Sequence, residues 1–425
     1  MMPPVRRVRL TADWILPIAS PPIAYGAVLV GDDGRIESVG PAALVPAPPG
    51  VPDLAFASAA LLPGLVNAHT HLELTGLAGA VAEPDFTRWI RGVRELKASR
   101  PPGWFRDAAR QGVRDAFAAG ITMVFDTGDS GEVLPALAEA GAAGVVYQEV
   151  FGPDPGQLAE SMTGLQARVS DLRRYETPRA RLGVSPHAPY TVSGPLYRAV
   201  ADYARRESLP MAVHLAESPA ETGFVVRNQG PFAEAWAARG LSPLESHGAP
   251  LGARRSPVAW LDGHGVLGPA TLCIHTIQLD AEDIRVLAAR GVSIAHCPIS
   301  NHNHGHGAAP AAALRRAGIR IGVGTDSVIS VGAFDLFAEM RAARALFGVG
   351  APEALALGTT EGARLMGRAD ETGRLGPGTW ADVIAVDLPE GVPGGVEEAV
   401  LAAGPGAVRA TFASGRPVYR RRHVA

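Results

Sequence analysis

Residues 60–74, ALLPGLVNAHTHLEL, combine an apolar run with two histidines that follow it, His69 and His71. Alternate residues of a β-strand point to the same face, so these two imidazoles can grip one metal ion. A His-x-His pair alone is weak evidence, because buried histidines are more often ordinary core residues. The stretch therefore predicts a buried strand with a candidate metal-binding end, and the rest of the sequence decides between the two interpretations.

Eight short apolar runs, counting residues 60–68, alternate with helical patterns along the centre of the chain. Helical periodicity is clear in residues 104–120 and 281–291. This alternation predicts an α/β fold, a (β/α)8 TIM barrel. The long gap between residues 215 and 271 predicts an added helix and a loop near the mouth of the barrel. The other seven apolar runs are residues 121–126, 144–150, 181–185, 211–215, 271–275, 292–296 and 320–324.

Both ends of the chain differ in pattern from the centre. Residues 1–57 and 375–425 contain short alternating strands and turns, with a hairpin signal at Asp33–Gly34 and little helical periodicity. Matching strand-rich ends predict one small β-sandwich domain built from both termini. The catalytic barrel is then expected to span residues 58–374.

Three further histidines end or closely follow other apolar runs, namely His187, His214 and His275, and Asp326 follows another run. Residues at the carboxyl ends of barrel strands converge on one face, where the active sites of such barrels lie. Several ligand-type residues at equivalent strand ends are hard to explain as separate core residues. They predict one divalent metal ion, zinc first, although iron, manganese, nickel or cobalt would also suit imidazole and carboxylate ligands.

Bulk composition excludes several classes of function. The 425 residues carry a net charge of −3 and no long basic run, which gives no electrostatic footprint for nucleic acid. The sequence contains no run of 18 apolar residues, so it predicts no membrane span. Two cysteines give no disulfide framework, so a reduced, cytoplasmic compartment is expected. With nucleic acid and membrane disfavoured, a small-molecule substrate is the expected partner. The sequence is also compatible with a homo-oligomer.

Lys97 is the only lysine among 39 basic residues. Schiff-base enzymes and P-loops both need a lysine, as does a binuclear metal site bridged by a carbamylated lysine. Each of these would have to use Lys97, which lies in the charged, apparently helical stretch RELKASR. The sequence therefore disfavours all three, and favours a single metal ion.

Five motifs occur in order along the chain: PGLVNAHTHLEL from residue 63, VHLAES from 213, IHTIQLD from 274, AHCPISN from 295 and GTDS from 324. In this order and spacing they resemble the amidohydrolase superfamily, and within it the mononuclear deaminase and chlorohydrolase branch. The resemblance covers nearly the whole chain, because that branch also has a composite β-domain from both termini.

The resemblance implies a role for each matching residue. His275 would hydrogen-bond the metal-bound water, Glu217 would be the proton shuttle of aromatic deaminases, and His187 would contact the substrate ring. The implied metal ligands are His69, His71, His214 and Asp326.

The chemistry of deamination gives these roles a reason. A metal ion lowers the pKa of water from 15.7 toward ~7, and Asp326 and His275 can take the proton of that water. Displacing ammonia from an aromatic ring also requires a proton on the ring nitrogen and one on the leaving amine. Glu217 can move both, although a carboxylate at a helix N-terminus also has a purely structural explanation.

The substrate is the least determined property. The stretch NAHTHLELTG followed by DFTRWIRGVRELKA resembles 6-aminodeoxyfutalosine deaminases of menaquinone biosynthesis. The alternatives are deaminases of S-adenosylhomocysteine, methylthioadenosine, adenosine or guanine, and a chlorohydrolase. A non-catalytic scaffold is disfavoured, because such relatives usually lose ligands. Aminodeoxyfutalosine carries a benzoate, which Arg88 or Arg91 could bind. Glu73 could reach substrate hydroxyls or merely support the metal ligands.

Two further features need an interpretation. His302, His304 and His306 lie in a glycine-rich stretch after the seventh apolar run, which predicts a variable loop near the substrate more than a second metal site. Cys297 has no partner at metal-ligand spacing, which predicts a packed residue at a strand end.

Overall fold

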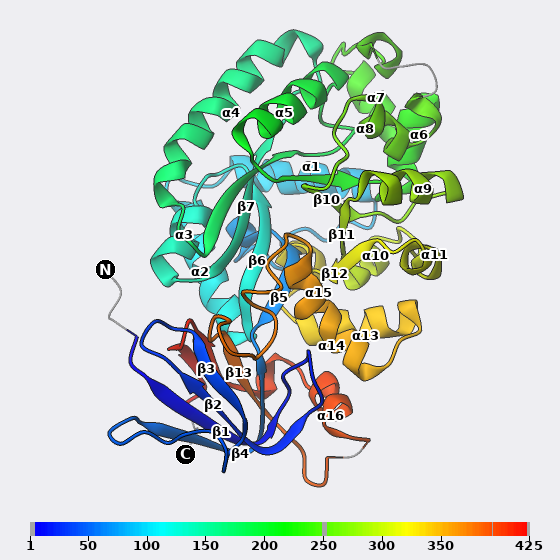
Figure 1. The fold of residues 1–425 in the computed structure, drawn as a ribbon. Coiled ribbons are helices and arrows are strands. Elements are labelled where there is room, and N and C mark those ends of the chain that lie inside the picture. The colour runs from blue at the N-terminus through cyan, green and yellow to red at the C-terminus, as the bar shows by residue number, and fades with distance from the viewer. Residues whose placement is uncertain (1–4, 249–252, 393, 423–425) are drawn as a thin grey trace.

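The computed structural model describes residues 5–248, 253–392 and 394–422. Eight parallel strands occupy the centre of the chain in the sequential order β5 to β12, with helices packed around them (Figure 1). The predicted (β/α)8 barrel is confirmed. Its strands are β5 (Leu65–Thr70), β6 (Ile121–Gly128), β7 (Ala143–Val150), β8 (Ala180–Pro186), β9 (Met211–Leu215), β10 (Thr271–His275), β11 (Ser293–His296) and β12 (Arg320–Val323).

The helices cover the outside of the barrel with their apolar faces inward. In α2, for example, Ala109, Val113 and Phe117 recur every fourth residue and are all buried. The helices are α1 (Phe86–Ala98), α2 (Trp104–Ala118), α3 (Val133–Ala140), α4 (Leu158–Leu172), α5 (Gly194–Glu207), α6 (Pro219–Arg227), α7 (Pro231–Ala237), α8 (Pro257–Gly263), α9 (Ala281–Arg290), α10 (Pro298–Asn303), α11 (Ala311–Arg316), α12 (Val328–Val331), α13 (Leu336–Phe347), α14 (Ala351–Leu357), α15 (Thr360–Arg364) and α16 (Val396–Ala402).

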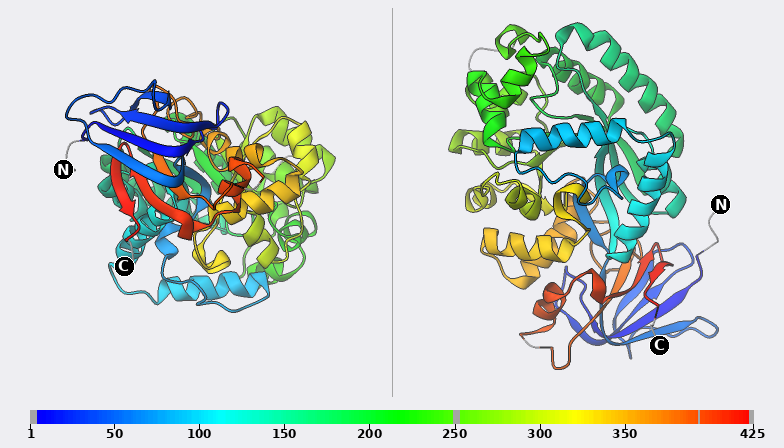
Figure 2. Two further views of the ribbon diagram at one scale, coloured as in Figure 1. Left: turned by 90° about the horizontal axis from the view of Figure 1, so that it is seen from below. Right: turned by 180° about the vertical axis from the view of Figure 1, so that it is seen from behind.

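A second sheet contains strands from both ends of the chain and packs below the barrel in Figure 1. Its seven strands form one mixed sheet in the order β15-β14-β13-β4-β1-β2-β3. The small domain built from both termini is thus present, and Figure 2 shows it from below. The strands are β1 (Val8–Ile15), β2 (Ile23–Val30), β3 (Ile36–Pro41), β4 (Asp53–Pro63), β13 (Val383–Asp387), β14 (Val408–Ala413) and β15 (Arg416–Arg420). Residues 1–4, 393 and 423–425 of the predicted domain lie outside the described residues.

The first predicted strand, residues 60–68, is divided between the two sheets. Its first part ends β4, which runs past the predicted domain boundary at residue 57, and its second part forms β5. Gly64 separates them, and a Cβ there would lie 2.1 Å from Thr122 Oγ1. An apolar run that passes from one buried sheet to the next has no polar interruption, so periodicity alone could not locate this break.

The long gap between β9 and β10 contains more structure than predicted. It contains α6, α7 and α8 with two short 3-10 turns, Leu244–His247 and Ala253–Arg255, where one helix and a loop were expected. Residues 249–252 of that predicted loop lie outside the described residues.

The barrel closes through contacts between β5 and the segment after β12. Asn67 Nδ2 donates to Thr325 Oγ1 at 2.8 Å, and Thr325 N donates to Asn67 Oδ1 at 3.0 Å. The backbone N–H of Asp326 then donates to the carbonyl of His69 at 3.0 Å. Gly324 allows this approach, because a Cβ there would lie 2.4 Å from His69 N. Closure therefore brings His69 and Asp326 side by side.

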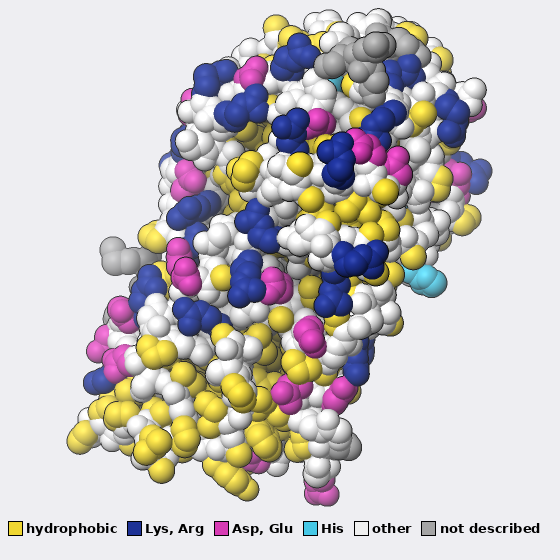
Figure 3. All heavy atoms as spheres, turned by 45° about the vertical axis from the view of Figure 1, so that its right-hand side comes forward, with side chains coloured by type: hydrophobic (Ala, Val, Ile, Leu, Met, Phe, Trp, Pro, Cys, Tyr) yellow, Lys and Arg dark blue, Asp and Glu magenta, His cyan; other side chains and the backbone are white. Residues whose placement is uncertain are grey.

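One face of the molecule carries charged side chains of both signs. On the face drawn in Figure 3, Lys and Arg side chains are interspersed with Asp and Glu, and apolar side chains gather over the terminal sheet. None of the helices among the described residues is long and apolar enough to cross a membrane.

We predict that Gly324→Ala destabilises the barrel by about 1–3 kcal/mol, because the new methyl group would press on the His69 backbone, which cannot move freely. Urea unfolding measures the loss. Gly268→Ala is the matched control, since a methyl group added at Gly268 would meet no heavy atom within 4 Å and the backbone there has no left-handed φ. Equal stability of the two variants would contradict the proposed role of Gly324 in closure.

Candidate active site

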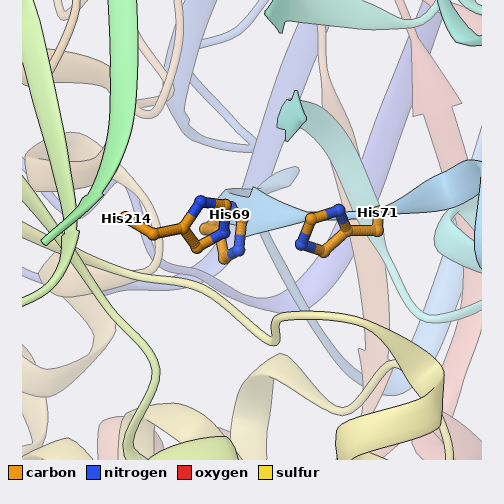
Figure 4. A group of neighbouring side chains, drawn as sticks. All are labelled: His69, His71 and His214. Carbon is orange, nitrogen blue, oxygen red and sulfur yellow. The ribbon is translucent and has the colours of Figure 1, made fainter. Parts of the chain in front are cut away.

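Three histidines meet at the carboxyl ends of two barrel strands. His69 and His71 come from the end of β5, and His214 comes from β9 (Figure 4). One ring nitrogen from each lies within 4.8 Å of the others. The side chains of all three point toward one another, as Figure 4 shows. The two strands stand apart in the sheet order, so only the curvature of the barrel brings these imidazoles together.

Asp326 completes the group from the segment after β12, which closes the barrel against β5. Its Oδ1 lies 3.5 Å from Nε2 of both His69 and His71. Ser300 Oγ donates to Oδ2 at 2.6 Å, and Ser327 N donates to Oδ1 at 2.6 Å. Burial would raise the pKa of Asp326, but the neighbouring His69 and the other imidazoles lower that pKa well below its usual value. The carboxylate is therefore ionised and held in a fixed orientation.

Backbone strain at the strand ends marks the same region. Asp326 and His275 adopt φ values of 61° and 69°, and Ala216 has a φ of 52°. Such left-handed conformations cost non-glycine residues about 1–3 kcal/mol and cluster at functional sites. Here hydrogen bonds such as that from Asp326 N to the His69 carbonyl compensate for the cost.

The hydrogen bonds of the histidines leave nitrogen lone pairs for a cation. His214 Nδ1 donates to the His187 carbonyl at 3.2 Å, and His71 Nδ1 lies 3.3 Å from Thr127 Oγ1, so Nε2 of each ring is available. Both ring nitrogens of His69 are buried and have no hydrogen-bond partner among the described residues. Buried polar atoms without partners are rare in native proteins. These three histidines with Asp326 therefore fit a divalent metal ion.

Burial keeps these imidazoles in the neutral form that binds metals. It is the largest influence on the pKa of His69, His71 and His214, and it lowers all three. An imidazole must lose its proton before it can coordinate a cation, so the site needs little further preparation at neutral pH.

A second polar group lies beside the first and contains Glu217. Glu217 Oε1 lies 3.4 Å from His275 Nε2 and 3.3 Å from His306 Nε2. Burial would raise the pKa of Glu217, but His275 and His306 bring this pKa down to about 2. His275 Nδ1 bonds to Asn301 Oδ1 at 2.9 Å, which fixes its ring and leaves Nε2 facing the carboxylate. Glu217 is thus an ionised base next to the candidate metal ligands.

Glu221 holds the turn that carries Glu217. Its two carboxyl oxygens accept hydrogen bonds from Ala216 N at 2.8 Å and Glu217 N at 2.9 Å. Helix α6 begins directly afterwards, with Ser218 as its N-cap. Glu217 therefore stands before the helix and faces the cavity, so the purely structural interpretation of its carboxylate is not needed.

A cavity of about 970 Å³ opens above these groups. Its inner end is lined by the candidate ligands together with Glu217 and His275, and its walls carry aromatic and apolar side chains from α1 and the loops after β7 and β8. The principal wall residues are Phe86, Trp89, Ile90, Val93, Phe151 and Tyr190. In the rear view of Figure 2, α1 lies across the barrel, so this helix forms one side of the mouth.

Glu73 lies behind the ligands and not in the open cavity. It is buried, and its Oε1 pairs with Lys97 Nζ at 2.7 Å, while Lys97 also pairs with Asp129 at 2.6 Å. Burial would raise the pKa of Glu73, but Lys97 lowers it to about 2. Of the two roles considered for Glu73, support of the site fits this position. The single lysine ties α1 to the barrel and lines the cavity wall.

The two arginines expected to meet a substrate carboxylate lie elsewhere. Arg88 is 64% exposed and pairs with Glu83 at 3.3 Å, and Arg91 is exposed; neither is among the residues lining the cavity. Arg94, one turn further along α1, does line the cavity, as does Arg239 beyond α7. Helical periodicity places Arg94 and Lys97 on one face, but periodicity alone does not indicate which face points inward.

A second cluster with metal-ligand spacing shares His214 with the first. Side-chain atoms of Glu149, His187 and His214 lie within 4.8 Å of one another. Because His214 Nδ1 bonds to a carbonyl, only its Nε2 remains, and one nitrogen lone pair binds one cation. The two clusters therefore cannot both hold an ion through His214, which agrees with a single metal ion.

Sequence reasoning did not assign two residues beside the candidate site, one in the cavity wall and one against Glu217. Glu149 is buried at the end of β7, and His306 is buried beside Glu217 and 4.4 Å from the Phe86 ring. The histidine-rich stretch was expected to be a variable loop near the substrate; its first part forms α10, and its last histidine enters the site. Cys297 is buried directly after β11, as predicted.

The sequence and the structure both have known counterparts. A model of the amidohydrolase family matches residues 60–418. The 5-methylthioadenosine/S-adenosylhomocysteine deaminase of Teredinibacter turnerae is 31% identical over 401 residues, 89% of this chain and 84% of that protein. The aminodeoxyfutalosine deaminase of Deinococcus radiodurans is 33% identical over 302 residues, 68% of this chain and 69% of that protein. An adenosine deaminase from Xanthomonas campestris with bound zinc has a TM-score of 0.83 at 27% identity, over 98% of this chain and 93% of that chain.

We predict that the stability falls in acid partly through His296, whose Nδ1 bonds to the His275 carbonyl at 2.9 Å. Burial lowers the pKa of His296 from 6.5 to about 4, so at pH 5 the unfolded chain takes up a proton here that the folded chain does not. This linkage removes about 2 kcal/mol of stability between pH 7 and pH 5. Urea unfolding at pH 7 and pH 5 measures the loss. In His296→Asn, which keeps a donor but does not titrate, the unfolding free energy should fall between these pH values by about 2 kcal/mol less than in the wild type. His302→Asn, at an exposed position, should keep the wild-type dependence.

Proposed function

Because the chain belongs to the amidohydrolase family, we propose that it is a metal-dependent aminohydrolase that removes ammonia from a 6-aminopurine nucleoside. One observation carries this proposal: an ionised, buried Glu217 lies against His275 beside the three histidines and Asp326. Cleaving an amide makes less demand on such a carboxylate, whereas aromatic deamination needs a group that moves two protons. The deaminases among the relatives support the same reaction.

We assign the ligands of one divalent cation, zinc first, to His69, His71, His214 and Asp326. The zinc in the related Xanthomonas deaminase supports this choice. When bound, the cation supplies the Lewis acidity that makes water nucleophilic at neutral pH. Oxygen and nitrogen donors of this kind also suit iron, manganese, nickel or cobalt.

The side chains of this protein then carry the protons. His275 Nε2 and Asp326 Oδ1 accept the proton of the attacking water, and the bond from His275 Nδ1 to Asn301 holds that ring in place. The attacking water supplies both protons that the reaction needs. Glu217 takes one of them and delivers it to the ring nitrogen beside the reacting carbon. The other, first accepted by His275 or Asp326, passes through Glu217 to the amine, which leaves as ammonia when the carbon–nitrogen bond breaks. Water supplies the oxygen of the product.

The cavity favours a nucleoside with an acidic 5′ substituent. Its volume of about 970 Å³ exceeds the space that a bare nucleoside fills. Arg94 and Arg239 both line it, and neither forms an ion pair with any residue in the described part of the chain. A guanidinium binds a carboxylate through two parallel hydrogen bonds. We therefore propose 6-aminodeoxyfutalosine, with its benzoate, as the substrate, which would place the enzyme in menaquinone biosynthesis.

S-adenosylhomocysteine is the second candidate. It also carries a carboxylate on its 5′ substituent, and relatives named for it match more of this chain than the aminodeoxyfutalosine deaminase does. Either nucleoside is a cytoplasmic metabolite, and the two buried free cysteines, Cys273 and Cys297, suit a reducing compartment. A homo-oligomer remains a prediction.

We predict ammonia release from 6-aminodeoxyfutalosine at the highest kcat/KM of a panel. The panel contains S-adenosylhomocysteine, methylthioadenosine, adenosine, 5′-deoxyadenosine and guanine, each followed by coupled ammonia detection. The two acidic nucleosides should exceed the neutral ones, because only they engage Arg94 and Arg239. Activity on guanine alone would refute the 6-aminopurine assignment, and release of chloride from a chlorotriazine without ammonia from any nucleoside would identify a chlorohydrolase.

We further predict that Glu217→Gln lowers kcat by 10²- to 10⁴-fold, the usual range for loss of general acid–base catalysis, with the metal content unchanged. Elemental analysis of the purified variant separates this outcome from loss of the cation. Glu207→Gln, an exposed carboxylate that pairs with Arg173, serves as the control and should retain full activity. Undiminished turnover by Glu217→Gln would disprove the shuttle.

A further inference from the structure

His306 is a buried histidine to which the proposed reaction gives no role. Its residue is 2% exposed, it follows α10, and it is not among the residues lining the cavity. Its Nε2 lies 3.3 Å from Glu217 Oε1 and has no hydrogen bond with any other residue in the described part of the chain. Because an ionised carboxylate only accepts hydrogen bonds, this nitrogen must carry a hydrogen to satisfy the contact.

The same oxygen of Glu217 faces a second imidazole, that of His275, whose Nε2 lies 3.4 Å away. His275 starts the proposed reaction as the neutral acceptor of a proton from water. Its Nδ1 donates the only ring hydrogen to Asn301 Oδ1 at 2.9 Å, so its Nε2 then carries a lone pair. A lone pair repels a carboxylate. His306 is therefore the imidazole that can donate to Oε1 before the reaction begins.

The backbone of His306 is tied to both neighbours of this oxygen. Its N–H donates to the carbonyl of Asn301 at 3.0 Å, so the residue that holds one imidazole by its side chain holds the other by its backbone. Gln278 Nε2 donates to the His306 carbonyl at 2.6 Å, and Gln278 N donates at 2.8 Å to the carbonyl of Ala216, directly before Glu217. The position of His306 is thus fixed relative to the turn that carries the carboxylate.

Helix α1 separates the His306 ring from the substrate. The Phe86 ring lies 4.4 Å from it at an interplanar angle of 84°, and Phe86 itself lines the cavity. His306 therefore lies behind the cavity wall, between Phe86 and Glu217. A side chain in this place affects the reaction through Glu217 and does not touch the substrate.

We propose that His306 is a positioning residue that holds Glu217 Oε1 beside His275 Nε2, so that a proton passes from His275 to Glu217. The inference rests on the proposed function and adds the group that aligns its proton shuttle. In this step the N–H bond of the His275 imidazolium breaks, an O–H bond forms on Glu217, and His275 becomes neutral again. Without the hydrogen bond from His306, the carboxylate turns away from the lone pair of His275 and the two groups lose their alignment.

A role in packing alone predicts the opposite ranking of two variants. His306→Gln keeps a donor, because its amide nitrogen can take the place of Nε2, whereas His306→Leu fills the space beneath Phe86 without a donor. If the donor matters, His306→Gln should keep most of the wild-type kcat and His306→Leu should lose about 10- to 100-fold, the usual effect of a hydrogen bond to a charged group. The KM should change little in both variants. If only packing matters, His306→Leu should be the more active variant.

The test measures kcat and KM for ammonia release from the best substrate of the nucleoside panel. The wild type and both variants are compared, and each substitution is repeated in the Glu217→Gln background. There His306→Leu should cause no further loss of kcat, because it acts through a carboxylate that is already absent. His302→Leu removes an exposed imidazole from α10 and should keep the wild-type kcat.

Metal analysis and thermal unfolding accompany the kinetics. Reduced kcat of His306→Leu with unchanged metal content, together with rescue by His306→Gln, supports the assignment. Undiminished kcat in His306→Leu, a loss confined to KM, a fall in bound metal, or a full further loss in the Glu217→Gln background would overturn it while the proposed function stands. If the wild type releases no ammonia from any aminopurine nucleoside, the proposed function fails and the assignment fails with it. Should His306→Leu not fold, His306→Met, which is unbranched and also lacks a donor, takes its place.

Discussion

The contact that closes the barrel is the constraint on which the rest of the structure depends. Asn67 bonds to Thr325 through both ends of its amide, and the next backbone bond joins Asp326 to His69. These residues are separated by more than 250 positions in the sequence, yet the closure places their side chains against each other. Gly324 is needed because the two backbones approach too closely for a side chain. A metal-ligand set taken from both edges of a sheet exists only if the sheet closes.

Buried charge in the site is compensated in two separate groups. Glu217 and Asp326 are surrounded by imidazoles, which keep these buried carboxylates ionised. Glu73 has a different partner, Lys97, which is the only lysine of the chain. An ionised carboxylate in an apolar interior is very unfavourable unless it is paired. The first group is therefore free to do chemistry, whereas the second fixes α1 beside the mouth.

The motifs that could be recognised in the sequence were those in which local order matters. The position of a ligand-type residue at the end of a strand can be read from the local sequence and does not depend on where the strand lies in the fold. His69, His214 and Asp326 could therefore be chosen as ligand candidates in advance. Arg88 and Arg91 were chosen because they lie in the loop and helix after the first barrel strand, and the rotation of α1 put them outside the cavity and Arg94 inside. Rotation of a helix depends on what it packs against, and α1 has no fully buried residue to define its inner face.

The sequence by itself determined the alternation of strands and helices, the small domain from both termini and the residue types available to a metal ion, because hydrophobic periodicity and strand-end position are local properties. Only the tertiary structure decided that β4 and β5 divide one apolar run, that His306 reaches Glu217, and that Glu149 faces the cavity. Those facts depend on distances between strands and loops that are remote in sequence. Such distances are set by barrel closure and by the packing of the loops above it, and no local pattern encodes them.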